Sequence, residues 1–453
     1  MSKTIAAISS AIGNSGISVI RISGDKAIEI ADLIFKNIND IKLKDKKGYT
    51  ASYGYIYDGD HKIDDCVATV FRNPNSYTGE DVVELSVHGG IISSKLTLRL
   101  LLAHGAVLAE PGEFTKRAFL NNKMDLIEAE SVMDLISSKS ILSHKAALDI
   151  KEGALSRKIN DIKNGLVSLC GHLQAWADYP EEDIKEVEKS EIQKTLVESK
   201  NKMLHILNTY DTGKIIKNGI STVILGKPNV GKSTLMNYLS GFEKSIVTEI
   251  PGTTRDIVEE TVVVGNTVLN LSDTAGIRES EDLVEKIGVE KALEKSKNAA
   301  LVLSVFDCSN ELSKEDEDIL RNLDKNNTII ILNKIDLSRK LSKEKFNEFK
   351  FVCEVSLKNN IGLDSIKDMI DKISDVSNFD ENSAIIYNER QRTKVDEAIK
   401  EIDDALNALN LNFTYDAITV SIEEAISHLL ELTGERVNDT VVDNIFHNFC
   451  VGK

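Results

Sequence analysis

The sequence predicts a multidomain protein with an α+β N-terminal part, an all-α part, and an α/β part inserted into the helical one. Three observations predict this. Short strand-like runs punctuated by glycine fill the first 120 residues or so. Two long, charged and periodic stretches that favour helices flank a region in which strand and helix patterns alternate. Only five prolines interrupt the 453 residues, and none follows residue 251.

Residues 1–121 are predicted to form the α+β domain. Strand-like runs at 16–22, 65–71 and 81–87 are separated by turn-rich text such as NPNSYTGED. This part carries 14 basic and 14 acidic residues, whereas the whole chain has a net charge of −17. Such an acidic chain does not bind nucleic acid through its overall charge, so contact with RNA would need a local patch or a partner.

Residues 122–218 and 379–453 are predicted to be helical, with the first stretch broken mainly at Asp178-Tyr179-Pro180. Residues 219–378 between them alternate strand and helix patterns, and Gly265-Asn266 reads as a hairpin turn. This pattern indicates a mostly parallel sheet with one antiparallel edge. Its strands are expected at 221–226, 258–264, 267–272, 300–306, 328–333 and 351–355. Three independent domains in series remain the alternative to an insertion.

The composition excludes several classes of protein. No apolar run reaches the roughly 18–20 residues that a membrane span needs, and the N-terminus lacks the features of a secretion signal. A cytoplasmic protein without a membrane partner is therefore expected. The five cysteines are scattered without a CxxC pair, which implies neither a disulfide framework nor a zinc site.

The segment GKPNVGKST at 226–234 follows the apolar run 222–225, which is the strand–loop–helix context of a phosphate-binding loop. Gly226 and Gly231 let backbone amides approach phosphate groups. Lys232 can reach the β- and γ-phosphates, and the Ser233 hydroxyl suits Mg²⁺. A merely flexible glycine loop would not require Lys-Ser after Gly231. Nucleotide contacts are expected from Asn229, Val230, Gly231, Lys232, Ser233 and Thr234.

Two later motifs indicate that the nucleotide is GTP. In NKID, Asp336 can accept two hydrogen bonds from the N1–H and N2–H₂ groups of guanine, and a buried Asp336 would lack those donors with adenine. Asn333 and Lys334 would brace this loop. Ser356, Leu357 and Lys358 follow the last strand at a suitable distance to contact the base. In DTAG, Asp273 and Gly276 would hold Mg²⁺ through water and sense the γ-phosphate, with Thr274 and Ala275 between them.

The loop TEIPGTTRD at 248–256 occupies the place of a nucleotide-sensing switch. Thr253 and Thr254 are both candidate Mg²⁺ ligands, and the residues alone do not choose between them. After DTAG, Ile277 replaces the glutamine that commonly orients the attacking water. Glu285 is a candidate for that role, as are Glu279, Glu281 and Asp282, although the spacing alone favours a solvated acidic surface over a catalytic role. Switch contacts to the nucleotide are expected from Thr248, Glu249, Ile250, Pro251, Gly252, Thr253 and Thr254.

The chain combines the phosphate loop and the switch loop with DTAGIRESEDLVEKIG, the N-terminal ISVIRISG and YTGEDVVELSVHGG, and the terminal FCVGK. In these segments, and over essentially its full length, it resembles the MnmE (TrmE) family of tRNA-modifying GTPases. This resemblance implies a tetrahydrofolate-binding and dimerising N-terminal domain and a GTPase domain inserted into a helical domain. It also implies a homodimer that joins the flavin-dependent MnmG (GidA) in a heterotetramer. Together they would place a 5-carboxymethylaminomethyl or aminomethyl group on the wobble uridine of certain tRNAs.

The resemblance further implies residue roles. Asn229, Thr248, Ile250 and Thr253 would bind K⁺, Ser233 and Thr254 would bind Mg²⁺, and Glu285 would position the attacking water. K⁺-dependent pairing of GTPase domains would activate hydrolysis, with Lys232 as a catalytic residue. Arg21, Glu80, Lys123 and Lys453 would contact a 5-formyl- or 5,10-methylene-tetrahydrofolate. A catalytic role is implied for Cys450.

Two other functions fit parts of the sequence. A GTP-switched ribosome-assembly factor would share the GTPase motifs, but residues 380–453 contain only Gly434 and Gly452 and hence no GXXG loop of a KH module. A regulatory GTPase with an inert folate-like domain is the other alternative.

Overall fold

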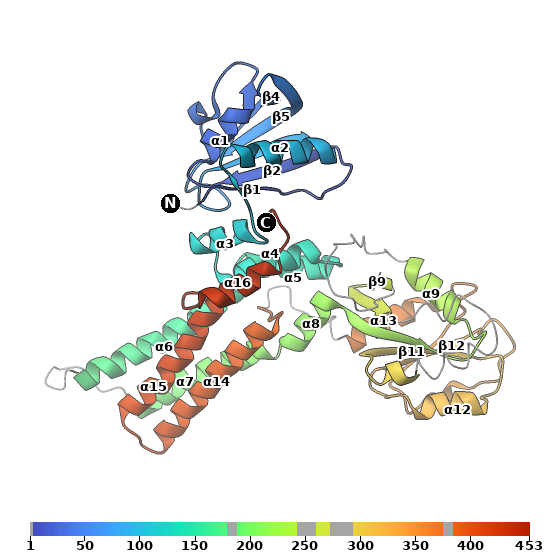
Figure 1. Cartoon of the computed structure of the whole chain (residues 1–453). Coiled ribbons are helices and arrows are strands. Elements are labelled where there is room, and N and C mark those ends of the chain that lie inside the picture. The colour runs from blue at the N-terminus through green and yellow to red at the C-terminus, as the bar shows by residue number, and fades with distance from the viewer. Residues whose placement is uncertain (1–2, 179–187, 242–259, 272–292, 375–383) are drawn as a thin grey trace. The chain divides into compact units, whose positions relative to one another are not determined.

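The computed structural model describes residues 3–178, 188–241, 260–271, 293–374 and 384–453 (Figure 1). The chain divides into two compact units, which are Met1–Met133 with Ile426–Lys453, and Asp134–Ala425. The predicted domain boundaries at 121, 218 and 378 stay predictions. Among the described residues, no helix combines the length and the apolar composition that crossing a bilayer would require.

A seven-stranded sheet forms the centre of the first unit, with the order β3-β4-β5-β6-β2-β1-β7. All neighbouring strands are antiparallel except β1 and β7, which are parallel. The three predicted strand runs correspond to β2, β5 and β6. The strands are β1 (Ile5–Ile8), β2 (Ile17–Ser23), β3 (Phe35–Asn37), β4 (Thr50–Asp58), β5 (His61–Phe71), β6 (Val82–His88) and β7 (Val107–Leu108).

One face of this sheet is covered by helices α1 (Ala27–Ile34) and α2 (Ile91–Ala103), which pack on alternate strand residues such as Ile20, Ile22 and Leu85. Because side chains alternate along a strand, Arg21 and Glu84 lie on the other face. On that face Phe114 packs with Ile5 and Ala7. The remaining helices that begin in this unit are α3 (Glu113–Leu120), α4 (Leu126–Ser137) and α16 (Asp439–His447), and a 3₁₀ turn spans Leu43–Asp45.

The residues that follow α16 return to the beginning of α3. The Gly112 amide donates to the Cys450 carbonyl at 3.3 Å, and the Phe114 amide donates to the Lys453 carbonyl at 3.1 Å. Gly452 has a φ of +94°, and a Cβ atom there would lie 2.5 Å from the Ile8 carbonyl oxygen. Only glycine fits this position, because it tolerates both the left-handed backbone and the close approach.

The sheet of the second unit has six strands in the order β13-β12-β11-β8-β10-β9. Its strands are parallel except for the β9–β10 hairpin at one edge, as predicted. All six expected strands are present within two residues of their predicted limits, and Gly265 provides the hairpin turn with a φ of +63°. They are β8 (Ile220–Leu225), β9 (Glu260–Val264), β10 (Thr267–Leu271), β11 (Leu301–Asp307), β12 (Thr328–Asn333) and β13 (Phe351–Glu354).

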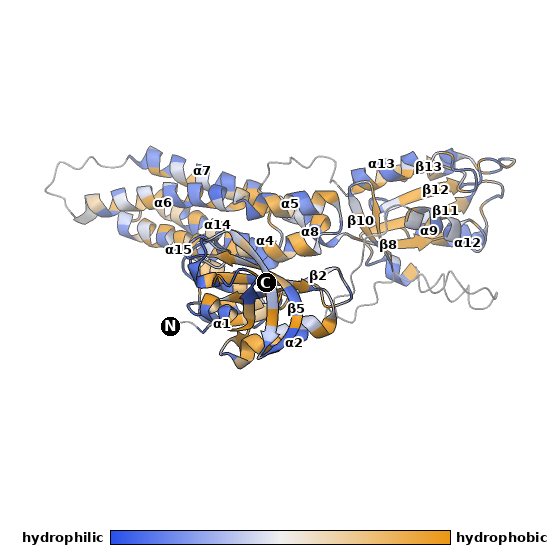
Figure 2. Ribbon diagram, turned by 90° about the horizontal axis from the view of Figure 1, so that it is seen from above, coloured by the Kyte–Doolittle hydropathy of each residue, from blue (hydrophilic) through white to orange (hydrophobic). Residues whose placement is uncertain are grey.

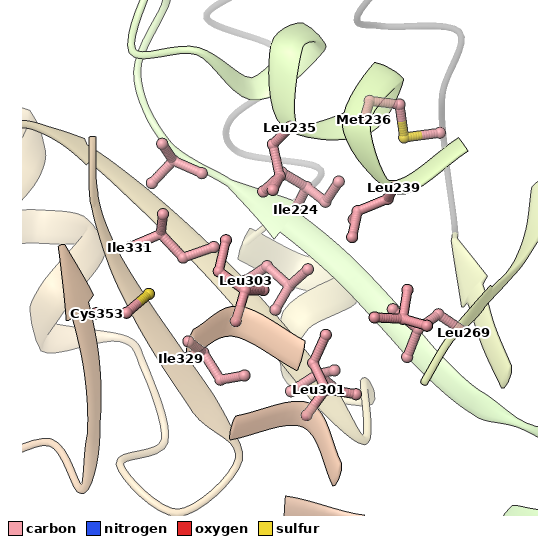
Figure 3. Close-up of a cluster of buried hydrophobic side chains, with 14 of the residues drawn as sticks. Ile224, Leu235, Met236, Leu239, Leu269, Leu301, Leu303, Ile329, Ile331 and Cys353 are labelled. Carbon is pink, nitrogen blue, oxygen red and sulfur yellow. The ribbon is translucent and has the colours of Figure 1, made fainter. Parts of the chain in front are cut away.

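Both faces of this sheet are buried, which explains why its strands are continuous apolar runs rather than alternating ones. On one face, Leu235 and Leu239 of α9 (Lys232–Gly241) and Ile366 of α13 (Asp364–Ile373) pack against strand residues that include Leu303 and Ile331 (Figure 3). On the other face, α12 (Lys314–Arg321) and the 3₁₀ turn Lys343–Phe346 contribute Ile319 and Phe346. In Figure 2, β11 and β12 are correspondingly hydrophobic.

Further helices precede and follow the six strands along the chain, and the first helical stretch is interrupted more often than predicted. The extra breaks have local causes. Ser140 forms a capping box with Ser143 and starts a new helix, and Gly153 adopts a φ of +83°. Helix α7 packs against α6 and α14. Most of the α7 surface seen in Figure 2 is hydrophilic. The helices are α5 (Ile141–Lys151), α6 (Ala154–Asp178), α7 (Lys189–Leu207), α8 (Tyr210–Asn218), α14 (Glu389–Asn410) and α15 (Tyr415–Thr433).

An ion pair joins strands β5 and β6 at the surface. The His88 Nδ1 atom lies 2.6 Å from the Asp64 carboxylate, and the His88 side chain is 70% exposed whereas that of Asp64 is 10% exposed. The hydrogen bond to Asp64 is the main cause that raises the pKa of His88. The negative charges of Asp64 and Asp65 also raise this pKa, whereas burial lowers it. The protonated form of His88 is therefore stabilised in the folded state.

We predict that His88→Gln lowers stability at low pH only. Because the folded-state pKa of His88 lies above its unfolded value near 6.5, the pair stabilises the fold below about pH 6.5. This contribution is lost as the pH rises through the folded pKa. Urea unfolding at about pH 5.5 and about pH 8.5 tests this, and His104→Gln serves as a control. An equal loss at both pH values would contradict the prediction.

Candidate nucleotide site and N-terminal ligand site

The phosphate loop connects β8 to α9, as its sequence predicts, and its glycines sit where no side chain fits. Gly226 has a φ of +147°, and a Cβ atom there would lie 2.5 Å from the Val305 carbonyl oxygen. Gly231 has a φ of +111°, and a Cβ atom there would collide with the Asn333 amide nitrogen. The loop is thus pressed against β11 and the end of β12. Val230, which is 2% exposed, anchors it in the core.

The Lys232 ammonium group folds back over the phosphate loop. Its Nζ atom donates to the carbonyl oxygens of Gly226 at 2.8 Å and Lys227 at 2.7 Å. A phosphate group entering the loop would offer this ammonium a charged acceptor in place of neutral carbonyls, which is the stronger interaction. Ser233 and Thr234 are exposed in the first turn of α9, where the amide groups of a helix N-terminus attract anions.

Asn333 holds three loops together at the carboxyl end of β12. Its amide nitrogen donates to the Val230 carbonyl at 2.7 Å, and its amide oxygen accepts from the Leu357 backbone at 3.0 Å. The neighbouring Lys334 donates to the Asn229 carbonyl at 2.8 Å. The structure therefore brings the predicted phosphate loop, NKID and Ser356–Lys358 into direct contact.

Asp336 lies at the edge of this cluster with its side chain exposed, so the expected burial is absent in the free chain. The Ser356 hydroxyl donates to one carboxylate oxygen at 2.6 Å. This hydrogen bond is the main cause that lowers the pKa of Asp336. The carboxylate is thus held ionised, in the form that accepts from N–H groups.

Asp307, Lys227 and Asp316 also belong to this site, although no sequence motif singles them out. Asp307 is the last residue of β11, and its carboxylate lies 2.7 Å from the Lys334 ammonium. Burial acts to raise the pKa of Asp307, but hydrogen bonds from Lys334 and Ser309 outweigh it and lower this pKa. Lys227 in the phosphate loop pairs with Asp316, which is 4% exposed, at 2.6 Å. These residues line a cavity of about 220 Å³ beside the loop. Asp307 could have been found from its place at the carboxyl end of a strand, where such sheets bind ligands.

The rest of the predicted nucleotide site lies outside the described residues. This holds for the switch loop and for the segment that follows β10. The residues concerned are Thr248, Glu249, Ile250, Pro251, Gly252, Thr253, Thr254, Asp273, Thr274, Ala275, Gly276 and Glu285.

In the first unit, the predicted folate residues gather around the loop before β6 and the start of α3. The Arg21 guanidinium pairs with Glu84 at 2.8 Å and lies over the rings of Tyr77 and Phe114, 5.4 and 5.5 Å from their centroids. The Phe114 amide binds the Lys453 carbonyl, as described above.

Lys123 reaches the same region from beyond α3. Its Nζ atom donates to the Pro74 carbonyl at 3.0 Å. Its carbon chain also lies beside Gly79, where a Cβ atom would be 3.4 Å from the Lys123 Cγ atom. Cys450 is partly exposed in the docked tail. The structure therefore places Lys123 against the loop before β6, and Cys450 and Lys453 beside the start of α3.

Glu80 is held by residues that the sequence did not single out. Arg117 of α3 donates to both carboxylate oxygens, at 3.1 and 3.0 Å, and the Ser23 hydroxyl donates to one of them at 2.7 Å. Glu80 and Arg117 line a cavity of about 550 Å³ between α3 and α16. Arg21, Lys123 and Lys453 do not line it. The sequence offered no signal for Arg117, because an arginine in a short polar helix is usually a surface residue.

Comparison with known proteins gives concordant results over the whole chain. The family model for the MnmE helical domain matches residues 126–450, and the model for the GTP-binding protein TrmE N-terminus matches residues 4–123. The chain is 41% identical over 454 residues to the tRNA modification GTPase MnmE of Clostridioides difficile (strain 630), covering 99% of each chain. It is also 41% identical over 456 residues to the protein of that name from Alkaliphilus oremlandii (strain OhILAs), again covering 99% of each.

We predict that Asp336→Asn changes the base preference of the site. The variant loses the acceptor for the two guanine N–H groups, so GTP binding weakens by at least about tenfold. Xanthine carries a carbonyl at C2, which the new amide can donate to, so binding of XTP improves. Competition of GTP, XTP and ATP against a fluorescent guanine nucleotide measures both effects, with Asp318→Asn on exposed α12 as the control. Unchanged selectivity would contradict the role of Asp336.

Proposed function

The chain belongs to the MnmE family of tRNA modification GTPases, and from this premise we propose which chemistry its two sites perform. In the cytoplasm it hydrolyses GTP and, with a flavin-dependent partner of the MnmG type, builds an aminomethyl-type group on C5 of the wobble uridine of certain tRNAs. The observation that carries the GTPase part is the contact of Asn333 with both the phosphate loop and the Ser356–Lys358 loop.

GTP binding follows from the residues around Asn333. Lys232 exchanges its loop carbonyls for the β- and γ-phosphates, and Asp336 and Ser356 face the guanine edge. Ser233 and Thr254 would bind Mg²⁺ directly and Asp273 would bind it through water, and the bound cation would supply positive charge to the phosphates. Glu285 positions the attacking water. The exposed Ser233 hydroxyl at the first turn of α9 fits a hard cation that prefers oxygen ligands.

A second cation, K⁺, is proposed at Asn229 with Thr248, Ile250 and Thr253. When bound it supplies positive charge next to the phosphates, where other GTPases insert an arginine. The exposure of Asn229 supports this fit. Its side chain is exposed, whereas its backbone carbonyl accepts a hydrogen bond from Lys334. The side-chain oxygen of Asn229 is therefore the group available to a cation.

The first unit is proposed to bind a tetrahydrofolate, which supplies the one-carbon unit of the product. The residues fit such a ligand by their chemistry. Arg21, Lys123 and Lys453 carry the positive charges that a glutamate tail requires. Glu80 is an acceptor for the N–H groups of a pterin ring, and Tyr77 offers an aromatic face beside Arg21. Cys450, in the tail that docks beside Phe114, is proposed to act on the bound one-carbon unit.

A homodimer through the first unit is part of the proposal. The face of the seven-stranded sheet opposite α1 and α2 carries a row of side chains across four strands, Tyr53, Val67, Ser86 and Val19. Tyr53 is 45% exposed and Val67 is 39% exposed. Exposed apolar residues that are aligned across a sheet support an association surface.

We predict that loss of this chain removes the modified nucleoside from the wobble position. Mass spectrometry of nucleosides from a strain that lacks the chain tests the proposal directly. The wild-type chain restores the modification, whereas Lys232→Ala does not, because it cannot neutralise the phosphates. Lys202→Ala, on the exposed surface of α7, is the control and restores it. An unchanged nucleoside profile without the chain would refute the function.

We also predict that GTP hydrolysis is at least about tenfold faster in K⁺ than in Na⁺, the order of effect expected from one well-placed charge at the transition state. Asn229→Ala removes this preference, whereas Asn237→Ala on the exposed face of α9 keeps it. Steady-state phosphate release at constant ionic strength measures the difference. Equal rates in both salts would remove the proposed cation site while leaving GTP binding intact.

A further inference from the structure

Glu80 and Arg117 form a largely buried ion pair in the first unit. Their side chains are 13% and 11% exposed. The Nη1 atom of Arg117 donates to both carboxylate oxygens of Glu80. The Nη2 atom donates to the Glu113 carboxylate and to the Lys3 carbonyl, each at 2.8 Å. Three acceptor groups thus fix the plane of the guanidinium. Arginine suits such a position because its donors have a rigid, planar arrangement.

Glu80 is also fixed from the side of β2. The Ser23 hydroxyl, which is fully buried, lies 2.7 Å from one carboxylate oxygen of Glu80 and 2.8 Å from the Thr78 hydroxyl. Glu80 and Arg117 together form part of the wall of the 550 Å³ cavity. An acid in a flexible surface loop would need none of these contacts. The arrangement instead holds one carboxylate in a single direction beside a space large enough for a heteroaromatic ring.

The helix that carries Arg117 is itself fixed by the chain's C-terminal residues. The amides of Gly112 and Phe114 bind the carbonyls of Cys450 and Lys453, and Lys116 pairs with Asp443 of α16. A Cβ atom at Gly112 would lie 2.6 Å from the Phe446 carbonyl oxygen, so the start of α3 has no room to shift. Arg117 lies in the next turn of α3, so fixing the start of this helix also fixes the backbone of Arg117.

We infer that Arg117 is a positioning residue for Glu80. It holds the Glu80 carboxylate in one orientation, so that the carboxylate accepts from adjacent N–H groups on a planar heterocycle, the chemistry of an amino-pteridine. This inference rests on the proposed folate function and adds to it a residue that does not touch the ligand. The C-terminal residues 450–453 would then affect the site indirectly as well, because they fix α3 and α3 carries Arg117.

The experiment measures ligand binding by calorimetry with the full-length chain and its Arg117→Lys variant. The probes are 5-formyltetrahydrofolate and its 2-deamino analogue, which lacks one of the N–H donors. Lysine keeps the charge but not the planar donor pair. Binding of 5-formyltetrahydrofolate is expected to weaken by roughly ten- to one-hundredfold, as when a hydrogen bond to a charged group is lost. The 2-deamino analogue keeps only one of the two N–H donors that face Glu80, so its binding is expected to weaken clearly less in the variant than that of 5-formyltetrahydrofolate.

Controls separate positioning from damage to the fold. Arg99→Lys changes an exposed arginine of α2 in the same unit and is expected to bind both probes like the wild type. Ser23→Ala removes the other contact to Glu80 and is expected to show the same selective loss as Arg117→Lys, but smaller. GTP hydrolysis of Arg117→Lys is expected to stay at the wild-type rate, because the nucleotide residues belong to the other unit.

The outcomes distinguish the inference from the function on which it rests. Wild-type binding of 5-formyltetrahydrofolate together with unchanged binding by Arg117→Lys overturns the positioning role alone. An equal loss for both probes also overturns it, since general damage to the site would not distinguish the two rings. Absence of binding by the wild type overturns the folate site and the inference with it.

Discussion

The nucleotide site depends on one buried amide. Asn333 is 4% exposed and satisfies a carbonyl of the phosphate loop and an amide of the Ser356–Lys358 loop at the same time. Without this side chain both backbone groups would stay buried and unpaired, at a cost of about 1–3 kcal/mol each. The glycine at 231 is the complement of this interaction, because any side chain there would displace the Asn333 amide. Phosphate recognition and base recognition are therefore joined at a single residue.

The topology of the sheet explains why one residue can do this. Parallel strands β8, β11 and β12 end at the same edge, so the loops that follow them meet without long connections. Leu225, Asp307 and Asn333 are the last residues of those strands. Three separate parts of the sequence thus contribute to the site: the phosphate loop after β8, Asp307 at the end of β11, and the NKID loop at the end of β12. Each is placed by a strand that is buried on both faces.

The six-stranded sheet and its phosphate loop were predicted well from the sequence because the signals for them are local. Glycine spacing, apolar runs and the hairpin turn at Gly265-Asn266 each depend on neighbouring residues, and six strands follow from them. The breaks in the helical stretch were harder to predict, since Ser140 and Gly153 act through caps and backbone angles that a charged periodic pattern conceals. Arg117 was missed for a different reason. Its importance comes from Glu80, 37 residues away in sequence, and no local pattern reports such a contact.

In the N-terminal site, packing against β1 restricts which residue can occupy a position at the far end of the chain. Gly452 must pass the Ile8 carbonyl with a left-handed backbone, and only then do the Cys450 and Lys453 carbonyls reach the amides at the start of α3. A side chain at position 452 would meet the backbone of Ser9 and of Ile8, and Ile8 is held in strand β1 of the sheet. The glycine of FCVGK is therefore constrained by the backbone that it contacts, independently of any chemistry at Cys450. This constraint also accounts for why Lys453 and Glu80, distant in sequence, are both fixed through the same short helix.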